Sequence, residues 1–314
     1  MKQVTDSLDI AVLHGGAVAA IIHHAAVTHL TTDPKLAAQS QPDILNLHIE
    51  FLRSCEKLES TITVTPLKLG AAVSTLQLQL SQNGQTKALA LATSTNFDKA
   101  LGPSAPTAWT PLPPPDPKPD FDRILANKPD DNWIPVRVEG ELIPMTGRIL
   151  ALDPRAGFRT DGIVDNWNGF VGDERMDATY IALMTDMIPS MSDTLMRNGG
   201  LYDAHRFWEK AKQWADANPG VTAVFKNSLK EVMQSATFNA TVTLDMEFKR
   251  RLPKAGLRFV FTRTATKRLQ DGRMDVDITI CDEDMELVCD AHQLILVVEA
   301  QRKFRGGKKS RQKL

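Results

Sequence analysis

The chain has 314 residues and a mass of 34.7 kDa, a length that predicts about two domains. Hydrophobic residues make up 42% of it and charged residues 24%, a composition that indicates a globular protein and excludes a disordered or collagen-like one. The net charge of −1 provides no general attraction to nucleic acid or to an anionic membrane, so we expect neither as a partner.

Apolar runs such as residues 294–298 are far shorter than the roughly 20 residues that a membrane helix needs, so we expect no membrane insertion. The three cysteines, Cys55, Cys281 and Cys289, are odd in number and show no C-x-x-C spacing, which argues against a disulfide framework. Acidic residues near the N-terminus do not fit a secretory signal. We therefore expect a reducing, cytoplasmic setting.

The first predicted element is a helix over residues 15–30, which follows the Gly15-Gly16 pair and carries apolar residues around most of its circumference. Such a helix is expected to be buried. Alternating or β-branched runs then predict four antiparallel strands, with an Asn83-Gly84 turn between the last two. These strands cover residues 45–51, 60–68, 73–81 and 85–97.

Eight of the twenty residues in 101–120 are proline, which excludes a helix interior or a central strand there. We expect an extended, semi-rigid spacer between two folding halves. The predicted organisation is an N-terminal unit (1–100), a Pro-rich linker (101–135), a C-terminal unit with the functional site (136–300) and a solvated basic tail (301–314).

After the linker the order of elements repeats. A short strand over residues 163–167 precedes a predicted helix over 173–197, in which Pro189 should produce a kink and free the carbonyl of Thr185. A second helix over 201–218 ends before a Pro-Gly pair. Four strand-like runs follow, with an Asp271-Gly272 turn between the second and the third. They cover residues 240–248, 257–269, 272–280 and 287–298.

A long helix followed by four antiparallel strands, occurring twice, buries the helix best if each sheet wraps its own helix. Two such units can then join at their edge strands, which removes exposed edges. The predicted fold is α+β, a double hot-dog: two helix-wrapped antiparallel sheets joined into one pseudo-dimeric unit.

Two groups of motifs carry a family resemblance. In the first half, His14-Gly15-Gly16 opens the helix, and residues 51–58 (FLRSCEKL) are similar to a Phe-Leu-Arg-Pro-Gly strand end, with Ser54 in the place of the proline. The chain resembles the type II (TesB-like) acyl-CoA thioesterases, which are double hot-dog proteins, and their fungal thioesterase-like relatives.

In the second half, the resemblance implies a catalytic triple. The helix segment YIALMTDMIPSM places Asp186 on the family's Asp, the strand ATVTLDMEFKR places Thr241 on its Thr, and LVCDAHQLILVV places Gln293 on its Gln. The family's Asp-His pair is Thr243-Leu244 here, and no Glu-Gly follows Gln293. These departures and the insert at 201–220 affect the expected substrate and the expected shape of the pocket more than the expected fold.

The implied chemistry is hydrolysis of a thioester by a positioned water, without a covalent nucleophile. Asp186 would act as base or hold the water, while the Thr241 hydroxyl and the Gln293 amide would orient it. No G-x-S-x-G elbow is found, which argues against an α/β-hydrolase. Each of the three residues also has a structural interpretation. Asp186 could be an ordinary surface acid, and Gln293 could be a buried amide that only satisfies its own hydrogen bonds. Thr241 could be an ordinary strand residue, because alternation predicts that it faces away from Val242 and Leu244.

His14, Gly15, Gly16, Arg250 and Arg251 are the candidate substrate-binding residues. His14 is either a pocket residue or a helix cap. The arginines belong to a basic cluster that either binds coenzyme A phosphates or forms a solvated loop. The spacing of the helical histidines does not fit a metal site, and we expect no metal and no cofactor. Phe207, Trp208 and Trp214 on the inserted helix pack in the core or a lid, or line an acyl pocket.

The leading hypothesis is therefore a thioester hydrolase, whose partner is an acyl-CoA or a carrier-bound acyl or polyketide chain in fungal specialised metabolism. One alternative is a non-hydrolytic hot-dog protein that binds, cyclises or transfers such a chain, and another is an inactive interaction module. Assembly of copies through the sheets is left open. The C-terminal Gln-Lys-Leu differs by one residue from the peroxisomal Ser-Lys-Leu, so peroxisomal import is the alternative to the cytoplasm.

Overall fold

A computed structural model describes residues 12–141, 143–199, 202–228, 231 and 235–299. Its helices are α1 (Gly15–Thr32), α2 (Pro34–Ala37), α3 (Phe121–Leu125), the 3-10 helix η1 (Pro144–Arg148), α4 (Ala178–Met184), α5 (Met191–Met196) and α6 (Ala204–Ala217). Its strands are β1 (Asp43–Phe51), β2 (Thr61–Lys68), β3 (Ser74–Gln82), β4 (Gln85–Thr95), β5 (Trp133–Gly140), β6 (Ile149–Pro154), β7 (Ile163–Phe170), β8 (Ala223–Asn227), β9 (Thr237–Phe248), β10 (Phe259–Ala265), β11 (Leu269–Gln270), β12 (Arg273–Cys281) and β13 (Leu287–Glu299).

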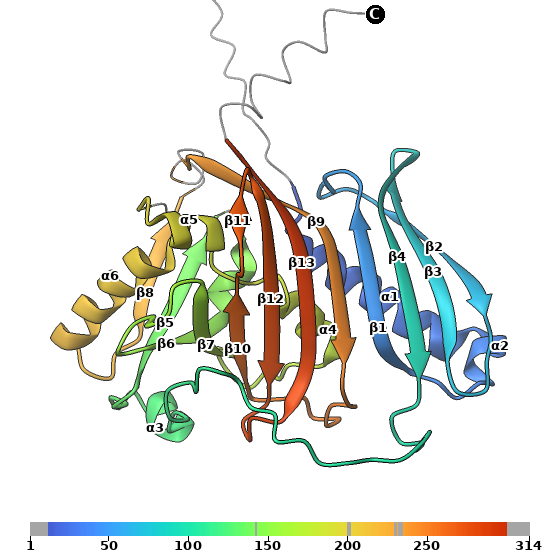
Figure 1. Cartoon of the computed structure of the whole chain (residues 1–314), viewed down its shortest axis with the longest axis horizontal. Coiled ribbons are helices and arrows are strands. Elements are labelled where there is room, and N and C mark those ends of the chain that lie inside the picture. The colour runs from blue at the N-terminus through green and yellow to red at the C-terminus, as the bar shows by residue number, and fades with distance from the viewer. Residues whose placement is uncertain (1–11, 142, 200–201, 229–230, 232–234, 300–314) are drawn as a thin grey trace, which may run out of the picture.

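These strands form one continuous sheet (Figure 1), in the order β2-β3-β4-β1-β9-β13-β12-β10-β7-β6-β5-β8, with β11 paired to β12. The two halves of the chain meet where β1 pairs antiparallel with β9, with Leu47 opposite Met246. Each half therefore covers an edge strand of the other, as predicted from the repeated order of elements. The double hot-dog prediction is confirmed.

Helix α1 lies on one face of the sheet, behind β1 and β4 in Figure 1, and α4 lies beside it on the same face. Ile22, which faces this core, is completely buried, whereas Ile21 on the opposite side of α1 remains 41% exposed. One apolar core joins residues of α1 and α4 to β1, β3, β9 and β12. Truncation of a residue such as Ile22 to Ala would cost about 2–5 kcal/mol, since the cavity it leaves cannot collapse fully.

The predicted single helix over 173–197 is wrong. Residues 173–177 precede the helix, where Met176 pairs with Leu257, and Asp177 caps α4 by accepting a hydrogen bond from the backbone N–H of Tyr180. Helix α4 then ends at Met184, with Thr185 as its C-cap, and α5 begins only after Pro189. Proline has no N–H and clashes with the preceding turn, so it breaks the helix here rather than bending it.

Strands β5, β6 and β8, which extend the sheet beyond β7, were not predicted from the sequence. Strand β8 pairs parallel with β5, and α6 packs against both through Phe207, whose ring meets Phe225 edge-on. All three strands are short. Strand β5 contains a proline, β6 ends at one and β8 follows the inserted helix, so alternation alone did not identify them.

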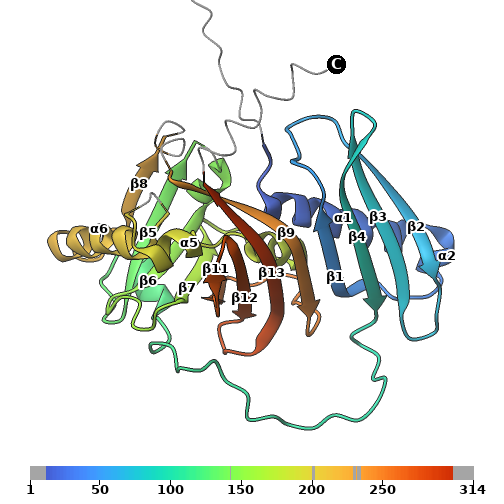
Figure 2. The same cartoon turned by 45° about the horizontal axis from the view of Figure 1, so that its top comes forward.

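No helix or strand occurs in residues 96–120. Figures 1 and 2 show this segment running outside the sheet from the end of β4 to α3. It is anchored where the indole N–H of Trp133 donates to the carbonyl of Pro117 at 2.6 Å. The predicted linker, 101–135, also contains α3 and the first residues of β5, and the predicted basic tail lies outside the described residues.

Within the described ranges, no helix has both the length and the apolar character needed to cross a membrane.

Candidate active site

Asp186 lies two residues beyond the end of α4, in the segment that Pro189 keeps out of helical geometry. Its backbone N–H still donates to the carbonyl of Leu183 at 3.2 Å, which holds the last turn in place. The side chain is buried, with 8% of the residue exposed, yet it forms part of a cavity wall. A buried carboxylate requires hydrogen-bond donors, and these come from two distant parts of the chain.

The first donor is the N-terminus of α1. The backbone N–H of Gly16 donates to Asp186 Oδ2 at 2.7 Å, and the same N–H lies 3.2 Å from Nδ1 of His14, which caps the helix. A Cβ on Gly15 would lie 2.7 Å from Asp186 Oδ2, and one on Gly16 would lie 2.5 Å from the carbonyl oxygen of Leu183. The glycine pair therefore allows α1 to approach the end of α4 closely, with the positive end of its dipole toward the carboxylate.

The second donor is Gln293 on β13, which is completely buried. Its Nε2 donates to Asp186 Oδ1 at 2.9 Å and to the carbonyl oxygen of Thr185 at 2.8 Å. The Thr185 carbonyl is the group that the sequence analysis expected Pro189 to free. The amide thus uses both of its N–H groups at the break between α4 and α5.

Thr241 joins this group through an irregularity in the sheet. Its Oγ1 lies 3.4 Å from Gln293 Oε1, although simple alternation predicted that it would face away from Leu244. The pairing of β9 with β13 shifts between Leu294 and Ile295, so that β9 has one extra residue at this point. This β-bulge reverses the alternation and brings Thr241 to the face that carries Gln293.

Asp186, Thr241, His14 and Gly15 all line one cavity of about 1020 Å³ that also extends beneath the missed strands. Gln293 lies behind its wall and supports it. Most of the lining near Asp186 is apolar, including Val18, Phe51, Met184, Val276 and Ile295. His14 Nδ1 is 3.4 Å from Asp186 Oδ2, so His14 both caps α1 and belongs to the cavity. The structure thus brings together the three predicted catalytic residues and the His14-Gly15-Gly16 turn.

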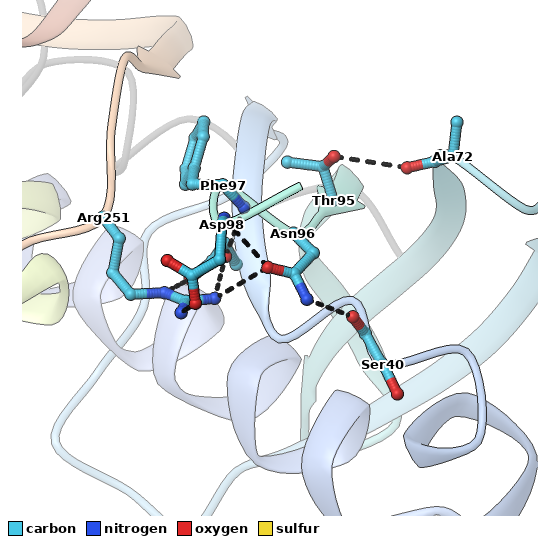
Figure 3. A network of polar contacts seen from close by, with 8 residues as sticks. Ser40, Ala72, Thr95, Asn96, Phe97, Asp98 and Arg251 are labelled. Atoms are coloured by element: carbon cyan, nitrogen blue, oxygen red, sulfur yellow. Dashed lines mark hydrogen bonds and ion pairs between the residues drawn. The ribbon is translucent and has the colours of Figure 1, made fainter. Parts of the chain in front are cut away.

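The structure does not bring the two predicted substrate-binding arginines to this cavity. Arg250 forms an ion pair with Asp282. Arg251 donates to Asp43 at 2.8 and 2.6 Å and to the Asn96 side chain at 3.2 Å, and it also pairs with Asp98. Figure 3 shows this network, which ties the end of β4 to the loop after β9.

The aromatic residues of the inserted helix α6 divide between the two predicted roles. Phe207 lines the cavity, whereas Trp208 donates from its indole nitrogen to the carbonyl of Pro154 at 2.8 Å. Trp214 remains 43% exposed. Only the first of the three therefore contributes to the cavity wall.

A polar patch in the same cavity was missed altogether. Asp153 on β6 accepts a hydrogen bond of 2.6 Å from Nδ2 of Asn166 on β7, and both residues line the cavity. Burial raises the pKa of Asp153 to about 7, and the donated hydrogen bond offsets this only in part. The sequence signal for this residue was a single acid at the end of the apolar run 149–152. The proline that follows it is typical of a turn, so the acid was not recognised as a strand residue.

Among the described residues, no group of three or more His, Cys, Asp or Glu side chains is arranged to hold a metal ion. Two neighbouring histidines of α1 differ in burial. His23 is buried, with Nδ1 3.2 Å from Thr179 Oγ1, whereas His24 is exposed. Burial lowers the pKa of His23 to about 4.

Comparison with known proteins places both halves in one family. Residues 4–95 match the model of the acyl-CoA thioesterase N-terminal domain, and residues 110–297 match that of the acyl-CoA thioesterase C-terminal domain. A curated relative, the thioesterase-like protein TwmA of Talaromyces wortmannii, is 24% identical over 322 residues, covering 96% of this chain and 87% of the relative.

Solved structures of low sequence identity share the fold. A hot-dog protein of unknown function from Alicyclobacillus acidocaldarius aligns with a TM-score of 0.61 at 15% identity, covering 93% of this chain and 89% of that one. The acyl-CoA thioesterase II TesB2 from Mycobacterium marinum aligns with a TM-score of 0.57 at 18% identity, covering 93% of each chain.

Proposed function

This chain belongs to the acyl-CoA thioesterase family, a family of thioester hydrolases, and we propose that it cleaves its thioester with a water held by Asp186 and Thr241. Gln293 and Gly16 act as positioning residues, since neither needs to touch the substrate. The proposed substrate is an acyl-CoA or an acyl chain on a carrier protein.

The observation that carries this proposal is the pair of donors on the Asp186 carboxylate. Gly16 N–H holds Oδ2 at 2.7 Å and Gln293 Nε2 holds Oδ1 at 2.9 Å, so the side chain has one orientation at the cavity wall. Each carboxylate oxygen has a second lone pair, which remains to accept a hydrogen bond from water. The Thr241 hydroxyl lines the same cavity and offers a further contact to that water.

In the proposed reaction, Asp186 accepts a proton from the water as its oxygen forms a bond to the thioester carbonyl carbon. The tetrahedral intermediate then collapses, the carbon–sulfur bond breaks, and the proton passes from Asp186 to the departing sulfur. The products are a carboxylic acid and a free thiol. Orientation of the water contributes much of the rate, because a bound nucleophile in the correct geometry avoids the entropy cost of a bimolecular encounter.

Negative charge on the carbonyl oxygen requires a donor of its own. Gly15 is the first residue of α1 and lines the cavity, and backbone N–H groups at the start of a helix bind anionic oxygens. We assign the oxyanion contact to the Gly15 N–H. A preorganised donor of this kind is worth on the order of 10²–10³ in rate in other hydrolases.

The large cavity, whose lining near Asp186 is mostly apolar, supports a role with long or complex acyl chains, such as those of specialised metabolism. The same cavity would serve a protein that cyclises or transfers the chain, if a substrate hydroxyl or amine replaced water. The products distinguish these outcomes: hydrolysis yields the free acid, while cyclisation yields a lactone or lactam.

The test is release of free thiol from a panel of acyl-CoAs by the purified full chain, with the acid quantified by mass spectrometry. We expect Asp186→Asn to lower kcat at least a hundredfold, since the amide cannot accept the proton. Asp161→Asn is the matched control, because that carboxylate is exposed and pairs with Arg197 at the surface. Equal thiol release by the Asp186→Asn variant and the wild type would contradict the proposal.

A further inference from the structure

The cavity wall formed by β6 and β7 differs chemically from the wall near Asp186. Asp153 lies on β6 beside Asn166 on β7, and Asn168 lies beside Ala151 one step along the same face. Three strands (β7, β10 and β12) separate β6 from β13, which carries Gln293. Four strand spacings of about 4.8 Å amount to on the order of 19 Å along the sheet. In the proposed reaction the polar patch would therefore face the acyl chain and not the reacting carbon.

Asp153 is only partly satisfied by the protein. Its Oδ1 accepts from Asn166 Nδ2 at 2.6 Å, but Oδ2 is buried and has no hydrogen-bond partner among the described residues. The residue is 4% exposed. Burial of a polar atom without a partner costs about 1–3 kcal/mol, and more if the group is charged. A site that retains this cost is expected to recover it when a ligand supplies the missing partner.

The missing partner must be a polar atom that enters through the cavity. A saturated hydrocarbon chain in the cavity would leave Asp153 Oδ2 unsatisfied. A hydroxyl on the chain donates to the ionised carboxylate, and a carbonyl accepts from the protonated one. Burial holds the pKa of Asp153 at about 7, so both forms are populated near neutral pH.

We propose that Asp153 and Asn166 form a subsite for an oxygen substituent on the acyl chain, so that the substrates are hydroxy- or keto-acyl thioesters rather than saturated fatty acyl thioesters. This inference rests on the proposed function for the position of the thioester, and it adds the class of chain that the cavity accepts. Asn166 fixes the Asp153 carboxyl and leaves Oδ2 for the ligand.

The test compares saturated, hydroxy- and keto-acyl-CoAs of one chain length, with the oxygen placed at successive carbons. We expect at least one oxygenated chain to have about tenfold higher kcat/KM than the saturated chain, because a tenfold ratio corresponds to the free-energy contribution of one well-formed hydrogen bond. Asp153→Leu should reduce this ratio to about one. Asp290→Leu is the control, because Asp290 does not line the cavity and pairs with Lys249, and the ratio should be unchanged there.

Asp153→Asn preserves the shape of the side chain and keeps the test informative if the leucine variant does not fold. Its oxygen can still accept from Asn166, and its free N–H₂ group can donate to a keto oxygen or to a hydroxyl oxygen, but it cannot accept from a hydroxyl. At pH 8, where ionised Asp153 of the wild type favours hydroxy over keto chains, we therefore expect this variant to bind hydroxy and keto chains about equally. An unchanged preference for hydroxy over keto chains in this variant would overturn the inference.

Binding of non-hydrolysable thioether analogues, measured by calorimetry on the wild type and on Asp186→Asn, separates the two proposals. Tighter binding of oxygenated analogues without turnover of any thioester would support the subsite and contradict hydrolysis. Turnover of all chains at equal kcat/KM, unaffected by Asp153→Leu, would support hydrolysis and contradict the subsite.

Discussion

The carboxylate of Asp186 accepts a hydrogen bond from the backbone N–H of Gly16, 170 residues earlier in the chain, at a distance of 2.7 Å. This contact joins the N-terminus of α1 in one half to the end of α4 in the other. The second half by itself supplies the Gln293 donor but not the Gly16 donor, so the carboxylate has both of these donors only when the two halves are joined. The site therefore depends on the junction of the two halves.

The glycine pair allows its two positions to be tested separately. In Gly15→Ala the new methyl group would lie 2.7 Å from Asp186 Oδ2, an atom that can shift only by weakening its hydrogen bond to Gly16, so we expect at least a tenfold loss of kcat with a loss of about 1 kcal/mol of stability. In Gly16→Ala the methyl would lie 2.5 Å from a backbone oxygen, that of Leu183, so we expect loss of about 2 kcal/mol or more of stability. Chemical denaturation and thiol release measure both, and equal effects at the two positions would contradict this account.

Gln293 should affect stability and activity together. Gln293→Leu leaves the Thr185 carbonyl and Asp186 Oδ1 without their donor, and each loss costs about 1–3 kcal/mol. We expect a lower free energy of unfolding and a lower kcat. His292→Leu is the control on the same strand, because that side chain is exposed and pairs with Asp277. An active, fully stable Gln293→Leu variant would exclude the positioning role.

Thr241 should act through its hydroxyl alone. Thr241→Val keeps the shape of the side chain and removes the group that lies 3.4 Å from Gln293 Oε1. We expect about a tenfold lower kcat, with stability lowered by no more than about 1 kcal/mol, since the residue is only half-buried. Thr241→Ser should retain most of the activity. Equal rates for the valine and serine variants would show that the hydroxyl takes no part.

Arg251 offers a test of coenzyme A binding by the basic cluster. Because its guanidinium is already paired with Asp43 and Asp98, we expect Arg251→Gln to lower stability by about 1–3 kcal/mol and to change KM for acyl-CoA less than twofold. Lys254→Gln, an exposed residue of the same loop, is the control. A raised KM with unchanged stability would instead support contact with the coenzyme A phosphates.

The pH dependence of stability should reveal Asp153. Burial raises its pKa from 3.8 to about 7, so the folded state binds this proton more tightly than the unfolded state does. The stabilisation is complete below about pH 4 and is lost as the pH rises through about 7. Asp153→Asn cannot ionise, so it should not lose this stabilisation as the pH rises. The free energy of unfolding of the variant minus that of the wild type should therefore be about 2–3 kcal/mol larger at pH 8.5 than at pH 5.

Urea unfolding at the two pH values measures this difference, with Asp161→Asn as the control at an exposed carboxylate. The same difference in stability at both pH values would mean that Asp153 remains ionised in the folded protein. In that case the hydroxyl, and not the keto, form of the proposed substrate would be the better ligand at all pH values.

Local sequence determined much of the fold. Gly15-Gly16 marks the start of α1, and the Asn83-Gly84 and Asp271-Gly272 pairs form turns in which both residues have positive φ. Pro189 identified in advance the free carbonyl at Thr185 that Gln293 now binds. These features follow from the allowed backbone angles and hydrogen-bonding groups of single residues, so they can be read without knowledge of neighbouring strands.

Tertiary structure alone decided the remaining features. The bulge that turns Thr241 toward Gln293 exists only because β9 pairs with a strand about fifty residues away, and local alternation predicted the opposite orientation. Asp153 became a cavity residue because β6 pairs with β7 in the register that places it beside Asn166. Side-chain direction in a sheet depends on register between distant strands, and the energy of a buried acid depends on what surrounds it, so neither is encoded in a local pattern.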